Sequence, residues 1–269
     1  MKLVVTGGAS GVGQALVRRL GDADIWILDL RPPATAAQNV RFVHTDLSDR
    51  AAIDHAISGL PEQIDGLANV AGIARADQPE TVVAVNFLAL RHLSEHLIDR
   101  LRQGGSIVNV SSIAGRDWHA KYERLRPLLD TPDYDEGLDW CRGHHDLLAR
   151  DPYTFSKRMV TAYSLLAARR ALQADVRINC VSPGPVETPL YPEFEALMGK
   201  AQSDWTKAQT GRAATPDDIA QVIDMLLTRP CGWLNGVDIP VDGGYSAGIQ
   251  TGWIDFAASP AMLQKQRRR

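Results

Sequence analysis

The sequence has few cysteines and no long apolar run. Three cysteines occur among 269 residues, at positions 141, 180 and 231. They lie far apart and form no CxxC pair, which argues against a disulfide framework and a cysteine-based zinc site. No apolar stretch reaches the roughly 18 residues that indicate a membrane-spanning helix. A strand-like run already begins at Lys2, so we expect no signal peptide and a cytoplasmic protein.

An excess of positive charge is also missing. Lysine and arginine number 29 against 32 acidic residues, for a formal net charge of −3. No basic field is therefore available to hold nucleic acid. The apolar share of 45% and the charged share of 23% are ordinary for a globular domain and exclude a largely disordered or coiled-coil chain. We expect neither nucleic acid nor a membrane as a partner.

Short β-branched runs alternate with longer helical segments. Strands are expected at 3–5, 25–28, 41–44, 66–70, 106–110, 176–181 and 237–241, and helices at 12–20, 49–57, 80–101, 153–172 and 219–227. This alternation predicts a parallel sheet with helices on both faces. The predicted fold class is α/β, with one Rossmann-type doubly wound domain over residues 1–269.

One segment, residues 115–151, interrupts this alternation. It is polar and rich in charge. Leucines at 125–129 predict one short helix, and Trp140 with Leu147 and Leu148 predicts another. The segment is too small to be an independent domain, so we treat it as an insert.

A glycine-rich turn lies between the first expected strand and the first helix. In Thr6–Gly13, Gly7 permits the tight turn, Gly11 allows close approach of a pyrophosphate, and Gly13 lets the helix pack on the strand. An anion would sit at the helix N-terminus. The alternative is a tight turn without a ligand. The residues predicted to hold a dinucleotide here are Gly7, Ser10, Gly11, Val12 and Gly13.

Polar residues follow the next strands at the same expected edge. Asp29 ends the second strand, where a carboxylate accepts hydrogen bonds from a ribose diol and repels a 2′-phosphate, which favours NAD over NADP. Arg31 would soften that preference. Asp46 and Leu47 are candidates to flank an adenine. The fourth strand ends on Asn69, Val70, Ala71 and Gly72, at the edge where such sheets bind ligands.

Tyr153 and Lys157 lie four residues apart at the start of a helix, so they share one face. A free tyrosine titrates near 10, and a neighbouring ammonium stabilises its phenolate. We therefore expect Lys157 to lower the pKa of Tyr153. Ser112, at the end of the fifth strand, would hydrogen-bond a substrate oxygen; strand-end turn chemistry is the alternative.

Two further polar features lie on the long helix. Asn86 is in register with the helix leucines and so faces the core, as a tie to the backbone or as part of a water relay toward Lys157. His92 and His96 have a metal-compatible spacing, but no third ligand is apparent. We expect them on a solvated face and predict no metal site.

Together these segments resemble the short-chain dehydrogenase/reductase superfamily. The resemblance runs from Lys2 to Gly244 and also includes Ser182–Thr188. It implies Tyr153 as general acid/base, Lys157 as its partner and ribose ligand, Ser112 as the substrate-positioning hydroxyl and Asn86 as the relay residue. It further implies that the cofactor NAD contacts Val186 and Thr188 through its carboxamide, above a floor of Pro183 and Gly184.

The insert separates Ser112 from Tyr153 by more residues than this family commonly shows. Such an insert resembles the bacterial 3α-hydroxysteroid dehydrogenase/carbonyl reductase group and the related coniferyl-alcohol dehydrogenases. That resemblance implies that the insert blocks the usual helix-bundle interface and leaves a dimer through the late helix and the last strand. We expect a homodimer or a homotetramer. A lid or simple surface decoration are the alternatives.

The predicted activity is interconversion of a secondary or aromatic alcohol with its carbonyl compound. Residues 189–211 form the segment that covers the substrate in this family, and their apolar content favours a hydrophobic substrate; packing of a short amphipathic helix would explain it equally well. The tail at 245–256 would close the pocket or cross a neighbouring subunit. A coniferyl-alcohol-type enzyme, a non-catalytic NAD-binding sensor and an epimerase or dehydratase are the alternatives.

Overall fold

Parallel strands form the centre of the molecule. The computed structural model describes residues 1–35, 37–75, 77–229 and 231–267. Within these ranges seven strands form one sheet in the order β3-β2-β1-β4-β5-β6-β7, all pairs parallel. The strands are β1 (Lys2–Thr6), β2 (Asp24–Asp29), β3 (Val40–His44), β4 (Ile64–Asn69), β5 (Leu101–Val110), β6 (Arg177–Pro183) and β7 (Asp238–Val241). The predicted doubly wound α/β fold is confirmed.

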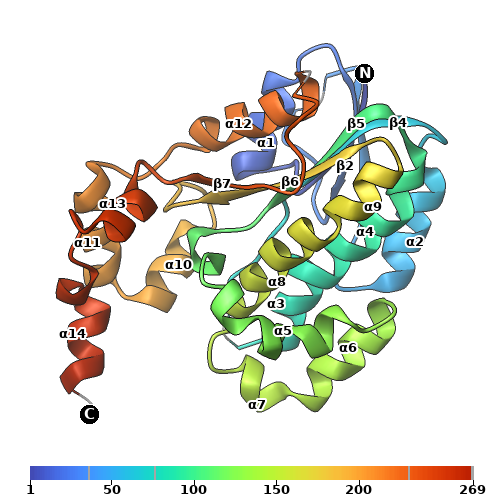
Figure 1. Cartoon of the computed structure of the whole chain (residues 1–269). Helices are drawn as coiled ribbons and strands as arrows, with labels where there is room; N and C mark the ends of the chain where they lie inside the picture. The colour runs from blue at the N-terminus through green and yellow to red at the C-terminus, as the bar shows by residue number, and fades with distance from the viewer. Residues whose placement is uncertain (36, 76, 230, 268–269) are drawn as a thin grey trace.

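Helices cover both faces of the sheet (Figure 1). On one face α1 (Gly11–Arg19) packs against α12 (Pro216–Thr228), and on the other lie α2 (Arg50–Gly59), α4 (Ala89–Leu97) and α8 (Pro152–Leu166). The sheet order reverses between β1 and β4, which places the ligand-binding crevice at their carboxyl ends. Across the described ranges, no helix is both long and apolar enough to cross a membrane.

The helix predicted over 80–101 is wrong at its end and in its continuity. It consists of α3 (Pro79–Val83), a π-helical turn (Ala84–Leu88), α4 and a 3₁₀ turn (Ile98–Arg100). Leu101 instead begins β5, because it pairs with Ile64 and is buried. The helix predicted over 153–172 is likewise divided at Ala167 into α8 and α9 (Ala168–Gln173).

The insert forms three helices that pack against α3, α4 and α8 (Figure 1). They are α5 (Tyr122–Leu129), α6 (Tyr134–Gly143) and α7 (His145–Leu148). The single helix predicted around Trp140 and Leu148 is therefore two, because the chain leaves helical geometry at His144 (φ −125°, ψ 30°). Leu125, Leu128 and Tyr134 are fully buried in the core, so the interpretation of the insert as surface decoration does not hold.

A buried arginine of α4 holds the insert in place. Arg91 is 3% exposed and donates to the carbonyl oxygens of Leu128 (3.4 Å), Thr131 (3.0 Å) and Asp133. Leu128 lies at the end of α5, and Thr131 and Asp133 lie in the turn before α6. The Leu128 and Asp133 oxygens also accept from Thr131 and from the Gly137 N–H, so the guanidinium adds a second donor to each. One α4 side chain thus closes the α5–α6 connection.

His92 does not lie on the solvated face that the sequence predicts. Its side chain is 3% exposed, and its Nε2 lies 2.6 Å from the Asp54 carboxylate of α2. Its ring also meets the ring of Tyr134 edge-on, at 6.0 Å between centroids. The insert is what covers this histidine, and helical spacing alone could not reveal that.

The environment of His92 makes stability depend on pH. Burial lowers the pKa of His92 below its usual 6.5, although Asp54 acts in the opposite direction. The unfolded chain therefore takes up a proton at higher pH than the folded chain does, so stability falls as the pH drops through about 6.5. We expect the thermal midpoint to fall more steeply between about pH 7 and pH 5 in the wild type than in His92→Gln.

A suitable control is His119→Gln, because His119 is exposed. This variant should follow the wild-type pH profile. The thermal midpoints are measured by scanning calorimetry over this pH range. If they change in parallel for wild type and His92→Gln, His92 is not the source of the pH dependence.

The remaining helices gather at one end of the molecule, beyond β6 and β7 (Figure 1). They are α10 (Tyr191–Met198), α11 (Lys200–Thr210), α13 (Tyr245–Thr251) and α14 (Pro260–Arg267). Here α11 contacts α10, α13 and α14. The predicted 189–211 segment and the tail at 245–256 therefore form one layer.

Candidate active site

The glycine turn has the geometry that its sequence predicts. Gly7 has a φ of 69°, and a Cβ atom there would lie 2.8 Å from the Cα of Ala71. A Cβ at Gly13 would lie 2.1 Å from the carbonyl oxygen of Gly7. Neither position accepts a side chain without a backbone shift. The turn is thus closed tightly on the ends of β1 and β4.

The start of α1 fits a pyrophosphate. Ser10 is the N-cap residue, but its side chain makes no capping hydrogen bond, so the first N–H groups of α1 remain open to an anion. A Cβ at Gly11 would lie 3.3 Å from Cγ2 of Thr188. Gly11 and Thr188 therefore face each other across a cradle that a larger residue would fill, and Val12 is partly exposed beside it. These residues fit a dinucleotide cofactor.

Asp29 lies at the end of β2 and braces the glycine turn. Its carboxylate accepts hydrogen bonds from the backbone N–H of Ala9 (3.1 Å) and Arg31 (3.2 Å). Sequence reasoning missed this bracing role because the contact joins two different βα turns. Binding of a ribose diol by the same carboxylate stays a prediction.

The two residues predicted to flank an adenine make contacts within the protein. Asp46 accepts from the N–H (2.8 Å) and hydroxyl (2.7 Å) of Ser48. Leu47 is only 7% exposed and packs in the core. Their contact with an adenine stays a prediction.

The end of β4 divides into a buried part and a part that faces the site. The Asn69 side chain is buried and donates to Ser94 and Asn109, so only its main chain lies at the sheet edge. Ala71 donates its N–H to the Thr6 hydroxyl (3.1 Å). A Cβ at Gly72 would lie 3.5 Å from Nζ of Lys157. Gly72 therefore brings the β4 end beside the catalytic candidates.

Tyr153 and Lys157 lie on the first turns of α8, which begins at Pro152 after the N-cap Asp151. Nζ of Lys157 lies 5.7 Å from the centre of the Tyr153 ring and donates to the carbonyl oxygen of Val110 (2.9 Å). Burial lowers the pKa of Lys157 to about 8. The two side chains share one face of the helix, as the spacing predicts.

The expected acidity of Tyr153 is not found. Burial raises the pKa of Tyr153 to about 12, although the neighbouring Ser112 hydroxyl acts to lower it. Burial destabilises the charged phenolate by more than its polar neighbours stabilise it. The phenol therefore keeps its proton at neutral pH.

The two serines after β5 have different roles. Ser111 is buried, and its hydroxyl donates to the carbonyl oxygen of Lys157 (2.8 Å) and lies 2.7 Å from the Thr161 hydroxyl. Ser112 caps the following 3₁₀ turn by accepting from the N–H of Ala114 (3.2 Å). Ser111 thus ties the strand to α8, which leaves Ser112 as the partly exposed hydroxyl beside Tyr153.

Asn86 forms the backbone tie that was one of its two predicted roles. Its Oδ1 accepts from the N–H of Ile73 (2.8 Å), and its Nδ2 donates to Ile73 O and Ser156 Oγ, both at 3.0 Å. It lies on the π-helical turn, a feature frequent at functional sites. The amide links the β4 end to α8, and a water relay stays a prediction.

The residues after β6 form a firmly held loop. Gly184 donates its N–H to the carbonyl oxygen of Val241 (3.1 Å), and a Cβ on it would approach Asp242 to 3.2 Å. Val186 pairs with Ala214 in a parallel bridge. Pro183 ends β6 itself, and Gly184, Val186 and Thr188 follow it in the loop at the carboxyl end of the strand.

An aromatic residue of the 189–211 segment lies on the catalytic candidate. Phe194 of α10 meets the ring of Tyr153 edge-on, with 4.7 Å between centroids. No residue of α10 is buried in the core, so its apolar side chains do not simply pack a helix. The sequence indicates the covering segment but not this particular contact, which requires the fold.

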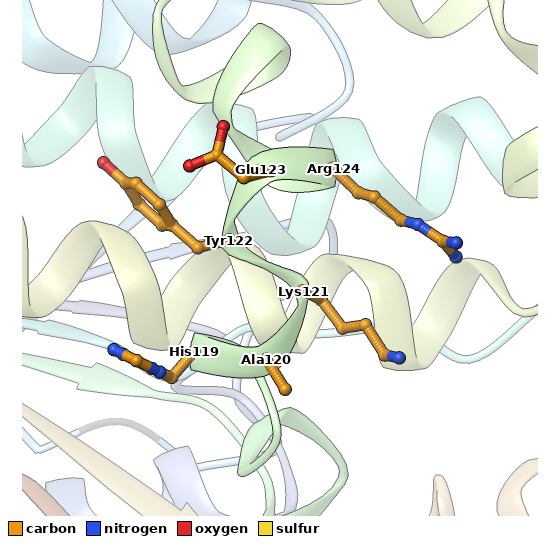
Figure 2. Close-up of a pocket in the computed structure, with 6 residues that line it drawn as sticks. All are labelled: His119, Ala120, Lys121, Tyr122, Glu123 and Arg124. Carbon is orange, nitrogen blue, oxygen red and sulfur yellow. The ribbon is translucent and has the colours of Figure 1, made fainter.

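One surface hollow belongs to the insert and not to this site. It has a volume of about 380 Å³ and is lined by the consecutive residues His119–Arg124. Figure 2 shows Lys121 and Arg124 pointing to one side of the segment and His119 and Tyr122 to the other. It contains none of the residues predicted to react or to hold the cofactor.

Two protein-family models match this chain, in two regions separated by a short gap. A family model described as short chain dehydrogenase matches residues 2–123, and one described as Enoyl-(Acyl carrier protein) reductase matches residues 141–246. The gap between them falls within the insert. Both halves of the sheet, with the glycine turn and the Tyr153–Lys157 pair, are thus covered.

Individual relatives match over nearly the whole chain. A coniferyl-alcohol dehydrogenase of a Pseudomonas species is 36% identical, over 91% of this chain and 96% of the relative. The structure of a 3-alpha-hydroxysteroid dehydrogenase from Pseudomonas complexed with NADH has a TM-score of 0.79 at 26% identity, covering 93% of this chain and 99% of that one. The structure of a 3-ketoacyl-(acyl-carrier-protein) reductase from Brucella melitensis shares the fold, with a TM-score of 0.69 at 24% identity. The match covers 91% of this chain and 98% of the reductase chain.

Proposed function

Because the chain belongs to the short-chain dehydrogenase/reductase superfamily of oxidoreductases, we propose that it transfers hydride between NAD(H) and a hydrophobic secondary or aromatic alcohol. The observation that carries this proposal is the convergence of Ser112, Tyr153 and Lys157 beside the glycine turn. No other group of residues in the described ranges combines a proton donor with a dinucleotide cradle.

Each catalytic side chain has a distinct task. Tyr153 exchanges the proton of the substrate oxygen, and Ser112 holds that oxygen by a hydrogen bond. Lys157 supplies positive charge near the phenol and is held by the Val110 carbonyl. When bound, the nicotinamide supplies the hydride chemistry. Asn86 positions Lys157's helix by linking α8 to the β4 end.

The preference for NAD is proposed from Asp29. Its carboxylate lies at the end of β2, where it would accept from a ribose diol and repel a 2′-phosphate. Replacing Asp29 by Asn should keep an acceptor for the Ala9 N–H while removing the charge. We expect the ratio of kcat/KM for NAD over NADP to fall by roughly 10- to 100-fold, the order of a short-range charge repulsion.

Initial rates with both cofactors measure this ratio. Asp29→Ala serves as the comparison, since it removes the brace as well as the charge and should also weaken NAD binding. An unchanged ratio in Asp29→Asn would place the cofactor determinant elsewhere.

We propose a hydrophobic substrate because an aromatic side chain contacts Tyr153 and the adjoining helix carries a further aromatic contact. Phe194 lies on Tyr153, and Trp205 of α11 meets Tyr245 edge-on at 6.3 Å. The 36% identity to a coniferyl-alcohol dehydrogenase favours an aromatic alcohol as one candidate. The fold of the hydroxysteroid dehydrogenase, with a TM-score of 0.79, favours a hydroxysteroid as the other.

A substrate panel separates these candidates. Initial rates are measured with hydroxysteroids, aromatic allylic alcohols and small secondary alcohols, each with NAD and NADP. Turnover of one class with NAD supports the proposal and assigns the pocket. Binding of NADH without turnover of any class would contradict it and favour a non-catalytic nicotinamide sensor.

A further inference from the structure

Arg116 follows Ser112 by four residues and contacts the C-terminal segment. It follows the 3₁₀ turn that Ser112 caps. Its guanidinium carbon lies 5.8 Å from the ring centre of Tyr245 and 5.5 Å from that of Phe256. Trp205 meets both rings edge-on at 6.3 Å. Two rings thus lie against the cation and a third ring packs on them; we name Arg116, Trp205, Tyr245 and Phe256 the Arg116 cluster.

The Arg116 cluster spans the carboxyl end of β6. Arg116 follows β5 and Tyr245 follows β7, while β6 lies between these two strands. Neighbouring strands are about 4.8 Å apart, so the cluster bridges roughly 10 Å of the sheet edge. The cluster thus lies at the carboxyl edge of the sheet, the edge that also carries Ser112 and the loop with Thr188.

The carboxylates nearest to Arg116 in the chain or in the cluster have other partners. Asp117 forms a two-bond pair with Arg158 (2.6 and 2.8 Å). Asp242 accepts from the N–H groups of Gly244 and Ser246, and Asp255 accepts from that of Ala257. Among the described residues no ion pair to Arg116 is found, and its side chain is exposed.

The Arg116 guanidinium can donate hydrogen bonds to a further partner. The faces of the Tyr245 and Phe256 rings hold the cation, and the Tyr245 hydroxyl also interacts with the guanidinium by a side-chain hydrogen bond. A guanidinium has five N–H donors, so others remain. The N–H groups at the edge of the guanidinium form a planar fork that matches a carboxylate. The rings of Tyr245 and Phe256 thus position the group without using its strongest recognition chemistry.

We propose that Arg116 is a specificity-determining residue that selects alcohols carrying a carboxylate at the end remote from the reacting carbinol carbon. This inference rests on the proposed function and adds the substrate class to it. The hydrophobic body of the substrate would lie against Phe194 and Trp205, with the carboxylate at the guanidinium.

The test compares matched acids and amides. Aryl carbinols and hydroxysteroids that bear a carboxylate on short or long spacers are assayed beside their neutral carboxamides. We expect wild-type kcat/KM to favour the best acid over its amide by about 10- to 100-fold, mainly through KM. In Arg116→Ala the ratio should fall to about one with amide turnover retained, and Arg116→Lys should keep part of the preference.

The control is Arg124→Ala, an exposed arginine of the insert that lies outside the cluster (Figure 2). It should keep the wild-type ratio. Equal rates for acids and amides in the wild type, or an unchanged preference in Arg116→Ala, would overturn the inference while leaving the dehydrogenase proposal intact.

If no carbinol is turned over, binding of the same acids and amides is followed through tryptophan fluorescence, since Trp205 belongs to the cluster. Preferential acid binding that Arg116→Ala abolishes would then support the inference although the proposed function fails. Equal binding would overturn the inference as well.

Discussion

Tyr153→Phe is expected to lower kcat for alcohol oxidation and carbonyl reduction by about 10²–10⁴-fold, the usual contribution of a general acid or base. The substitution removes only the hydroxyl, so the edge-on contact with Phe194 stays. NADH binding, followed by fluorescence titration, should therefore remain close to that of the wild type. The circular dichroism spectrum should also be unchanged.

Tyr122→Phe is the matched control for this variant. Tyr122 lines the hollow of the insert, whose lining includes none of the catalytic candidates (Figure 2), and loss of its hydroxyl should leave kcat unaltered. Wild-type turnover in Tyr153→Phe would reject the assigned acid/base. Loss of NADH binding together with turnover would instead indicate a disturbed fold.

Arg91→Ala is expected to lower the free energy of unfolding by about 3–5 kcal/mol. The Arg91 guanidinium is buried and donates to the carbonyl oxygens of Leu128, Thr131 and Asp133. Removing it loses these charge-assisted hydrogen bonds, each of which contributes about 1.5–3 kcal/mol. The Thr131 oxygen is then left without its partner, whereas the Leu128 oxygen still accepts from the Thr131 hydroxyl and the Asp133 oxygen from the Gly137 N–H. For a chain of this size the thermal midpoint should fall by roughly 10 °C.

Chemical denaturation measures the free energy, and limited proteolysis reports whether the insert opens first. Arg142→Ala is the control, because its pair with Asp139 lies on the exposed surface of α6. That variant should keep the wild-type midpoint, since surface pairs contribute little. A fully stable Arg91→Ala protein with a protease-resistant insert would show that Arg91 does not anchor it.

The local motifs could be predicted because their chemistry is contained in short spacings. Gly7 and Gly13 meet through a contact between residues six apart, and Tyr153 and Lys157 share a face through one helical turn. Hydrophobic periodicity likewise predicted the strands and their parallel arrangement. Element ends were less predictable, because the pairing of Leu101 with Ile64 competes with helical periodicity.

Properties that depend on surroundings could not be predicted in the same way. The expected acidic Tyr153 has its pKa raised to about 12, because burial outweighs its polar neighbours. His92 is covered by Tyr134 from a segment more than forty residues away, and so is buried where helix spacing indicates exposure. Burial is a sum over distant segments, and a short pattern does not contain it.

The sequence by itself determined the α/β fold, the glycine turn and the order of the catalytic candidates, since each follows from local spacing and periodicity. Only the tertiary structure decided that Arg91 anchors the insert, that Phe194 lies on Tyr153, and that Arg116 meets Tyr245 across β6. Each of these contacts joins segments far apart in the chain. Their energy comes from desolvation and partner geometry, which exist only after the chain has folded.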